Sequence, residues 1–298
     1  MIETRTFTGA KPGPTLLILG GVHGNEPCGA MAVERLMADL DGGRVALDSG
    51  MLICAPRVNR AALDRDLRFI DANLNRILGA YDPDTAEAAL VPPLRALLEK
   101  CYALLDLHSY SAGGPPFVFA ADDAATMGFA RAMPAAAIIT GWQQAQAAAD
   151  PANAATAGMG TTEYARARGA CAITFECGGH ADPASPENGY RAARAALAHF
   201  ALAADIPNET KPSPPAHLVL AHIFFRRKPG ALARAWRHLD PIRAGETFAR
   251  HDDGTVLAAP MDGFVVLPAK SASLGSEWGY LAAKNMAQKE TGPCGPAS

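Results

Sequence analysis

A histidine and a glutamate stand three residues apart in a glycine-rich segment that follows an apolar run. The segment reads GGVHGNEP and carries His23 and Glu26. Both side chains can direct a donor atom at one ion, and ligands of open α/β sheets bind at the carboxyl ends of strands. An HxxE pair alone is a weak signal, because a tight turn with solvated polar residues has the same pattern.

A second histidine, His108, ends another apolar run, ALLDLH. Together with His23 and Glu26 it completes the His2Glu set that catalytic zinc uses, in which a fourth position stays open to water. We therefore predict one Zn2+ per chain at these three residues. Asp106 shares a strand face with His108, so it either orients that histidine or bonds to the backbone.

Glu176 ends the apolar run ACAITFE, where a carboxylate is costly to bury without a partner. Such a group either reaches solvent or serves a site. A metal hydrolase needs a carboxylate base beside the water that attacks, and Glu176 is the candidate. An ordinary surface glutamate is the alternative, and Glu163 and Glu187 are weaker candidates for the same role.

Arginine and amide side chains gather in the irregular segment after the second predicted strand. They are Asn59, Arg60, Arg68, Asp71, Asn73, Asn75 and Arg76. Arginine suits bidentate recognition of a carboxylate and stabilisation of a developing oxyanion. A solvated charged loop is the alternative, and we assign residues 64–66 to it.

Alternating strand and helix patterns must position these groups. Apolar runs predict strands at 15–21, 51–55, 103–108, 117–120, 135–140 and 170–176, and helical patterns lie at 27–40, 94–100, 161–168 and 185–204. The pair Pro92-Pro93 indicates a break before the second helix, and Ser185 is the predicted N-cap of the last. Strands apolar on every side belong in a sheet covered on both faces. The predicted fold class is α/β, with a mixed, largely parallel sheet between helices.

The composition changes after residue 206. Ile206–Pro215 is polar and proline-rich, which indicates a linker, and short alternating runs that predict an all-β unit follow. We predict an α/β catalytic domain at 1–206 and a small β-rich domain at 216–290. The alanine-rich stretch 145–157 is a candidate mobile loop, and residues 289–298 are a candidate loose tail.

The composition excludes several classes of protein. Hydrophobic residues make up 49% and charged residues 19%, so the chain is not intrinsically disordered. With 27 Lys and Arg against 30 Asp and Glu, the net charge of −3 predicts neither nucleic-acid nor membrane binding. There is no secretory signal pattern, and the six scattered cysteines form no CxxC pair, which favours reduced thiols in the cytoplasm. The sequence leaves open whether the chain forms a homo-oligomer.

Four motifs together resemble the succinylglutamate desuccinylase/aspartoacylase family, which is similar in turn to the zinc carboxypeptidases. In chain order they are GGVHGNEP, RFIDANLNR, LLDLH and ITFECGG, and the resemblance extends over most of residues 15–200. The runs AAPMDGFVVLP and GSEWGYLA look like the family's capping domain. The resemblance implies a zinc-carboxypeptidase-like α/β domain whose small β domain restricts the site to small substrates.

The resemblance also implies roles for individual residues. His23, Glu26 and His108 would bind zinc, Glu176 would be the general base, and Arg68 looks like the arginine that polarises the scissile carbonyl. Further positions look like substrate binders: Asn75, Arg76, Arg166 with Arg168 as its competitor, and Tyr280.

The implied reaction is hydrolysis of the amide bond of a small N-acetyl or N-succinyl amino acid, which releases a carboxylate and a free amine. Two alternatives stay open: a metallocarboxypeptidase that acts on peptides, and a non-catalytic, metal-dependent binder of small molecules. The stretch SYSAGGPP after His108 does not identify a subgroup, so the acyl group and the amino acid stay open as well.

Overall fold

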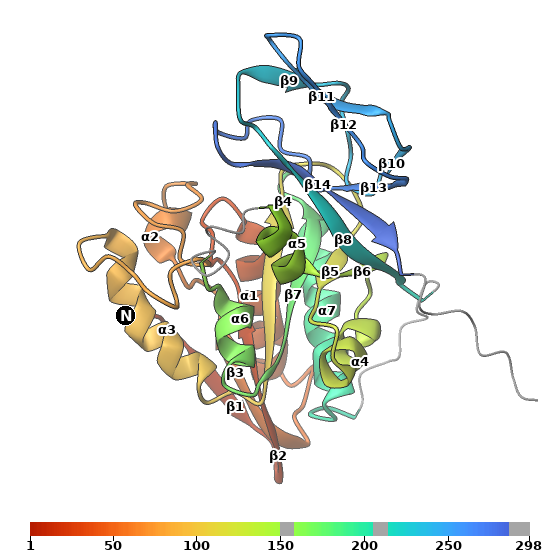
Figure 1. Ribbon diagram of the computed structural model, residues 1–298. Coiled ribbons are helices and arrows are strands. Elements are labelled where there is room, and N and C mark those ends of the chain that lie inside the picture. The colour runs from red at the N-terminus through yellow and green to blue at the C-terminus, as the bar shows by residue number, and fades with distance from the viewer. Residues whose placement is uncertain (150–157, 205–213, 286–298) are drawn as a thin grey trace, which may run out of the picture.

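One sheet of eleven strands runs through the computed structural model and carries helices on both faces (Figure 1). The structure describes residues 1–149, 158–204 and 214–285. The strand order is β1-β3-β2-β4-β7-β5-β6-β8-β14-β13-β10, and a small sheet near the C-terminus has the order β12-β11-β9.

The bounds of the elements follow the apolar runs closely. The strands are β1 (Arg5–Thr8), β2 (Lys11–Leu19), β3 (Ser49–Ala55), β4 (Ala103–Tyr110), β5 (Phe117–Phe119), β6 (Ala137–Thr140), β7 (Cys171–Gly179), β8 (Ala216–Phe225), β9 (Gly230–Leu232), β10 (Pro241–Ile242), β11 (Thr247–His251), β12 (Val256–Ala258), β13 (Gly263–Val266) and β14 (Glu277–Lys284). The helices are α1 (Pro27–Asp41), α2 (Arg60–Leu63), the 3-10 helix η1 (Ala86–Leu90), α3 (Val91–Leu98), α4 (Ala124–Ala132), α5 (Trp142–Ala149), α6 (Thr161–Arg166) and α7 (Ser185–His199).

Strands β3, β2, β4 and β7 are parallel neighbours, and β5, β6 and β8 form a second parallel set. The two sets join where β5 pairs antiparallel with β7, and β1, β14, β13 and β10 also pair antiparallel. The predicted α/β fold, with a mixed sheet between helices and a small β region near the C-terminus, is confirmed.

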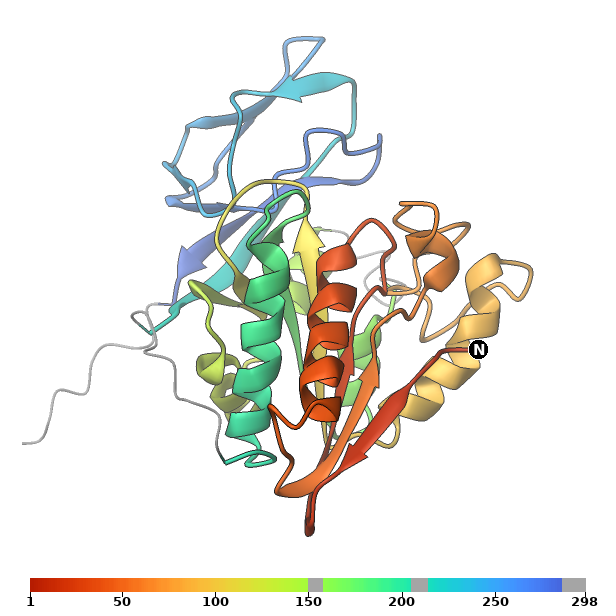
Figure 2. The same cartoon turned by 180° about the vertical axis from the view of Figure 1, so that it is seen from behind.

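Two helix layers bury the parallel strands. Helices α1, α4 and α7 share one apolar cluster with the sheet, and α3 and α6 share another on the opposite face. Figure 2 shows α1 and α7 in front of the strands, and the head of β4 pointing toward the C-terminal strands. All eight residues of β4 are buried. This burial on both sides explains why the segment ALLDL is apolar apart from Asp106, because the strand has no face in water.

Three local predictions differ from the structure. Helix α3 begins at Val91, so Pro92 and Pro93 lie in its first turn and not before it; proline is tolerated there because those N–H groups have no helical partner. Helix α7 ends at His199. Its N-cap is Ala184, and Ser185 is the first helical residue, whose hydroxyl donates to the Gly179 carbonyl at 2.8 Å.

The sheet is continuous across the predicted domain boundary, because β8 pairs in parallel with β6. The division into 1–206 and 216–290 stays a prediction. The predicted linker up to residue 213, the stretch 150–157 and the tail lie outside the described residues, whereas 142–149 form α5.

The five cysteines in the described part of the chain are free, and Cys294 lies outside it. Within the described ranges, no helix combines the length and the apolar character that a bilayer crossing requires.

Candidate active site

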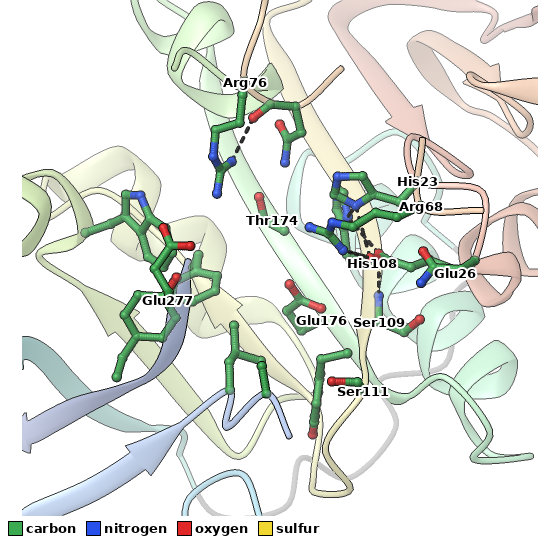
Figure 3. A pocket seen from close by; sticks show the side chains of 18 of the residues that line it. His23, Glu26, Arg68, Arg76, His108, Ser109, Ser111, Thr174, Glu176 and Glu277 are labelled. Atoms are coloured by element: carbon green, nitrogen blue, oxygen red, sulfur yellow. Dashed lines mark hydrogen bonds and ion pairs between the residues drawn. The ribbon is translucent and has the colours of Figure 1, made fainter. Parts of the chain in front are cut away.

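Three strand ends bring the predicted metal ligands and base together. His23 and Glu26 lie on the turn between β2 and α1, and His108 lies in β4, which pairs in parallel with β2. Glu176 in β7 is the register partner of His108 in β4. Figure 3 shows the four side chains meeting at one end of a cavity. The neighbouring parallel strands thus place at one edge residues that are far apart in the sequence.

His23, Glu26 and His108 form a buried group that could hold a metal ion. Each is at most 3% exposed, and their ligand atoms all lie within 4.8 Å of one another. Glu26 Oε1 lies 3.0 Å from His23 Nδ1, and Glu26 Oε2 lies 2.9 Å from His108 Nδ1. The two Nδ1 atoms are 3.2 Å apart. Among the described residues, this is the one group of three or more His, Cys, Asp or Glu side chains whose ligand atoms lie close enough together to hold a metal ion.

The contacts at the far side of each imidazole, a hydrogen bond for His23 and an ion pair for His108, determine which nitrogen faces this centre. His23 Nε2 lies 2.9 Å from Asn73 Oδ1, an acceptor, so Nε2 carries the proton and donates. His108 Nε2 lies 2.9 Å from Asp106 Oδ2. Both Nδ1 lone pairs therefore point at the same spot, where they repel each other unless a cation or a proton lies between them. This arrangement fits a divalent metal bound by two imidazoles and a carboxylate.

The charges around the group agree with this assignment. Burial lowers the pKa of His23, whereas the Asp106 and Glu26 carboxylates outweigh burial and raise that of His108 well above its ordinary value. Burial also opposes ionisation of Glu26, but the two imidazoles lower its pKa well below the usual range. Without metal, the centre therefore holds its proton on His108, and a metal ion takes the place of that proton.

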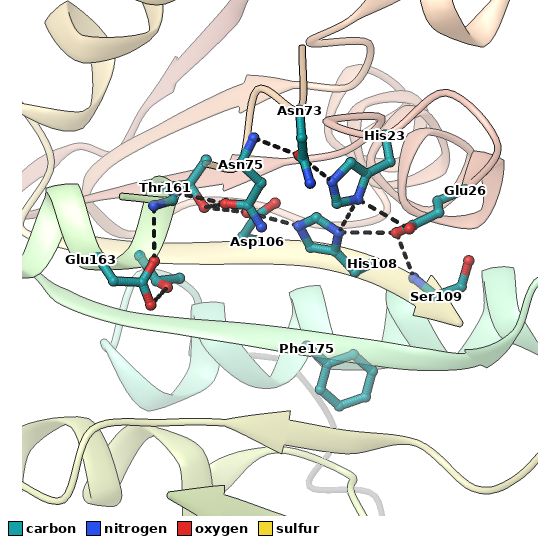
Figure 4. A network of polar contacts seen from close by, with 12 residues as sticks. His23, Glu26, Asn73, Asn75, Asp106, His108, Ser109, Thr161, Glu163 and Phe175 are labelled. Carbon is teal, nitrogen blue, oxygen red and sulfur yellow. Dashed lines mark hydrogen bonds and ion pairs between the residues drawn. The ribbon is translucent and has the colours of Figure 1, made fainter. Parts of the chain in front are cut away.

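The acceptors behind the histidines belong to one network (Figure 4). Asn73 Oδ1 also accepts from the Asn75 backbone N–H at 3.0 Å, and Asn75 Oδ1 accepts from the Thr161 N–H at 2.8 Å. The Thr161 hydroxyl donates to Asp106 Oδ2. The network thus runs from His23 round to His108. The sequence indicated Asp106 as a candidate, but it offered no signal for Thr161, which only the fold brings to β4.

Glu176 is a buried carboxylate that can still accept hydrogen bonds. It is 8% exposed and lines the cavity, and its Oε2 has no hydrogen-bond partner among the described residues. Burial raises the pKa of Glu176 well above its ordinary value; Glu26 adds to the shift, and His108 opposes it. A carboxyl group with a raised pKa beside a metal centre is suited to accept a proton and to release it again.

Arg68 reaches the metal centre from the loop after α2. Its Nη1 donates to Glu26 Oε1 at 2.8 Å, and its side chain is 44% exposed. Glu26 Oε2 accepts from the Ser109 N–H at 3.0 Å, so both of its oxygens are engaged. Arg68 therefore presents its remaining N–H groups to the cavity beside the centre.

The cavity has a volume of about 580 Å3 and continues away from the metal centre. Figure 3 shows Arg76 and Glu277 around this outer part, with Thr174 on its floor. The Arg76 guanidinium carbon lies 5.8 Å from the centre of the Trp142 ring, and the Trp142 and Tyr280 rings are 4.9 Å apart. A mixed wall of aromatic and charged groups therefore faces the reacting end.

The predicted substrate binders all line this cavity: Asn75, Arg76, Arg166 and Tyr280. Asn75 Oδ1 is already used by Thr161, which leaves its amide N–H2. Arg76 donates to the Asn75 carbonyl at 2.7 Å. These contacts leave part of each group's donors available to a ligand, and the assigned roles stay predictions.

The alternative candidates for the substrate-binding arginine and for the general base lie in different places in the structure. Arg166 lines the cavity and donates to Glu163 Oε1 and to the Ala172 carbonyl, both at 3.1 Å. Arg168 instead stacks on the Tyr164 ring, away from the cavity lining. Of the alternative bases, Glu163 is tied to Arg166, and Glu187 pairs with Arg35 on the surface.

Sequence reasoning missed the outer wall of the cavity. Trp142 and Glu277 both line it. Trp142 in α5 belongs to no motif, and Glu277 in β14 lies within GSEWGYLA, where nothing marks it as a cavity residue. Asn73 lies inside a motif, but the sequence does not distinguish its contact with His23 from the substrate-binding role predicted for Asn75 and Arg76. No local pattern distinguishes a residue that supports a ligand from one that touches substrate.

Comparison with known proteins identifies relatives of this site and fold. A family model of the succinylglutamate desuccinylase/aspartoacylase catalytic domain matches residues 12–203. A search of curated proteins finds no match for the chain.

Solved structures with the same fold share little sequence with the chain. A succinylglutamate desuccinylase/aspartoacylase from Rhodobacter sphaeroides superposes with a TM-score of 0.76 at 21% identity, over 95% of this chain and 89% of that one. The product-bound ectoine utilization protein EutE (DoeB) from Ruegeria pomeroyi gives 0.73 at 20% identity, over 95% and 89%. A succinylglutamate desuccinylase from Vibrio parahaemolyticus gives 0.72 at 17% identity, over 94% and 86%. At these identities the likeness concerns the fold.

Proposed function

The chain belongs to the succinylglutamate desuccinylase/aspartoacylase family, and from that premise we propose that it hydrolyses the amide bond of a small N-acylated amino acid, with one zinc ion per chain. The observation that carries the proposal is the buried His23–Glu26–His108 group with Glu176 beside it, whose Oε2 has no hydrogen-bond partner among the described residues. The products would be a carboxylate and a free amino acid.

The residues divide the work as follows. When bound, zinc polarises the acyl carbonyl and lowers the pKa of a water molecule from 15.7 to about 7. Glu176 accepts a proton from the attacking water and delivers it to the nitrogen of the leaving amine. Arg68 donates to the carbonyl oxygen as negative charge develops there, and one such donor is typically worth about 3–4 kcal/mol. Asn73, which accepts a hydrogen bond from His23, and Asp106, which forms an ion pair with His108, hold both imidazoles with Nδ1 toward the metal site.

Recognition of a substrate carboxylate would fall to the cations of the outer cavity. Arg76 and Arg166 line it and keep N–H donors beyond their contacts with the protein, and the amide of Asn75 lies beside them. A carboxylate held there would fix the amide bond over the metal centre, which converts binding energy into correct orientation. Tyr280 and the β strands around it would close the outer end against long substrates.

A panel of N-acetyl and N-succinyl amino acids, incubated with the zinc-loaded protein, tests the reaction. Release of free amine is the readout. A carboxypeptidase would instead trim a peptide from its C-terminus and leave N-acyl amino acids untouched. A non-catalytic binder would bind members of the panel in calorimetry but turn none over.

The carboxylate is tested separately, by comparing kcat/KM for an N-acetyl amino acid and for its C-terminal amide. The proposal expects the free acid to be the better substrate. Equal values of kcat/KM would mean that no cation of the site binds the substrate carboxylate. That result would refute the carboxylate-binding role of Arg76 and Arg166.

A further inference from the structure

Glu87 is a buried carboxylate that lies outside the cavity and plays no part in the reaction as described so far. It belongs to η1 and is 1% exposed. Each of its oxygens accepts two hydrogen bonds. Oε1 accepts from Ile70 N at 2.7 Å and from Asn59 Nδ2 at 3.1 Å. Oε2 accepts from Asp71 N at 3.1 Å and from Ala72 N at 3.0 Å.

Three of these four donors are consecutive backbone N–H groups of one irregular loop. The loop has Arg68 at one end and Asn73 at the other. Arg68 donates to Glu26, and Asn73 accepts from His23, so both flanks of the loop contact metal ligands. The Arg68 carbonyl also accepts from Gly24 N at 3.2 Å, which ties the loop to the turn that carries His23. Figure 4 shows Asn73 and His23 side by side.

The fourth donor connects the same carboxylate to a second support of that turn. Asn59 is 1% exposed and caps α2 through Oδ1, which accepts from Ala62 N at 3.2 Å. The Asn59 N–H donates to the Gly21 carbonyl at 2.8 Å, two residues before His23. Glu87 therefore joins the two chain segments that hold the metal turn from outside.

The carboxylate is ionised in this position. Burial opposes the charge, but the backbone N–H groups and Asn59 outweigh it and lower the pKa of Glu87. Without this carboxylate, three backbone N–H groups of the loop would lose the acceptor that they share. The loop between Arg68 and Asn73 thus takes its shape from a side chain and not from regular secondary structure.

We propose that Glu87 is a positioning residue for the metal centre, which it serves by fixing the loop that sets both the Asn73–His23 contact and the Arg68–Glu26 contact. The inference rests on the proposed metal site, and it assigns to Glu87 an effect on metal affinity that a merely structural residue would not have. Supports behind the metal ligands typically change metal affinity or activity by 10–100-fold when they are lost.

Glu87→Gln is the sharpest test because the amide keeps the size of the carboxylate. Each oxygen accepts hydrogen bonds from two N–H groups. In either orientation of the glutamine amide, the new NH2 group therefore faces two N–H donors and cannot accept a hydrogen bond from them. The matched control is Asp39→Asn. Asp39 is also a buried carboxylate, 7% exposed, and it accepts from Arg44 and Tyr190 at the other end of α1.

Both variants are measured on folded protein, well below the unfolding midpoint. Zinc affinity is obtained by competition with a chelator, and the cobalt(II) form gives a visible spectrum that reports ligand geometry. We expect Glu87→Gln to bind zinc at least about 10-fold more weakly and to change the cobalt spectrum. Asp39→Asn should lower the melting temperature and leave both readouts at wild-type values. If Glu87→Gln does not fold, Glu87→Asp, which keeps the charge on a shorter stem, takes its place with the same expectations.

Wild-type zinc affinity and cobalt spectrum in the Glu87 variant would overturn the inference. So would an equal loss of affinity in Asp39→Asn, because general destabilisation would then explain both. A wild-type protein that binds no zinc would overturn the inference and the proposed function together. A wild-type protein that binds zinc, loses it in Glu87→Gln and still hydrolyses no N-acyl amino acid would leave the inference standing and refute the reaction alone.

Discussion

The two metal-site histidines show how a residue's role depends on the group behind it. Each imidazole has its Nε2 against an oxygen of the protein, Asn73 Oδ1 for His23 and Asp106 Oδ2 for His108. The protein therefore determines the tautomer before any metal arrives. Preorganisation of this kind lowers the cost of binding, because neither ring has to turn and only the Nδ1 proton of His108 has to leave.

Replacing His23 with alanine should abolish retention of zinc. The change removes one of three protein ligands and leaves Glu26 with a single imidazole partner. Metal content after dialysis, measured by mass spectrometry, is the readout. The control is His222→Ala, because His222 is an exposed histidine of β8. One zinc per chain in the His23 variant would refute the assignment of the ligands.

Glu176→Gln should leave zinc bound and remove most of the turnover. The amide is nearly isosteric but cannot accept the proton, and loss of a general base typically costs about 10²–10⁴-fold in rate. Stopped assays of amine release and metal content are measured on the same sample. Glu187→Gln is the control, since that carboxylate lies on the surface and pairs with Arg35. A Glu176 variant with a near-normal kcat would refute the assignment of Glu176 as the general base and would favour Glu163 instead.

Among the elements, the turn between β2 and α1 depends on close contact with a short helix. A Cβ on Gly24 would lie 2.1–2.4 Å from backbone atoms of Ala62 and Leu63 in α2. The metal turn and α2 thus pack backbone against backbone, and the only way to admit a side chain is to move one of them. The same turn carries His23 and Glu26, so any such movement displaces ligands.

Gly24→Ala should therefore destabilise the fold by about 1–3 kcal/mol and weaken zinc binding as well. Denaturant unfolding of the metal-free protein measures the first effect, and chelator competition measures the second. Gly128→Ala is the matched control: Gly128 lies within α4, and beyond the adjacent residues and backbone of its own helix the added Cβ would meet no atom within 4 Å. That substitution should stabilise by about 0.5–1 kcal/mol, because alanine is the better helix former. Wild-type stability in the Gly24 variant would contradict the packing described here.

Over the whole molecule, His238 links the C-terminal strands to the parallel sheet. It is 3% exposed and stacks on Phe117 of β5 at 4.1 Å between ring centres. Its Nδ1 accepts from Leu267 N at 3.4 Å, whereas its Nε2 has no hydrogen-bond partner among the described residues. Burial lowers the pKa of His238 from 6.5 to about 3. The folded protein thus holds this ring neutral where the unfolded chain would protonate it.

Stability should therefore decline on acidification. Above pH 6.5 the ring is neutral in both states and contributes no pH dependence. Between about pH 6.5 and 3 only the unfolded state binds the proton, so the free energy of unfolding falls by up to about 1.4 kcal/mol per pH unit. His238→Phe removes the imidazole that takes up this proton in the unfolded state. Urea unfolding of both metal-free proteins from pH 6 to 4 should show a shallower slope for the variant, and parallel slopes would disprove the buried neutral histidine.

Much of the fold was predictable from the sequence because its signals are local. Strands buried on both faces read as continuous apolar runs, so β4 and β7 were found within a few residues of their bounds. Helix α1 begins at Pro27, as predicted. Helix α3 shows the limit of such signals, since two prolines look the same in sequence whether they precede a helix or form its first turn.

The residues of the site likewise include some that the sequence indicates and some that only the structure reveals. His23, Glu26, His108 and Glu176 each end or follow an apolar run, and neighbouring parallel strands that end at one edge must bring such residues together. Their identity as candidates was therefore contained in the sequence. Thr161, Trp142, Glu277 and Glu87 were not, because each acts through contacts with other segments of the chain. Such contacts depend on how loops return to the sheet, and no local periodicity records that path; only the tertiary structure determines it.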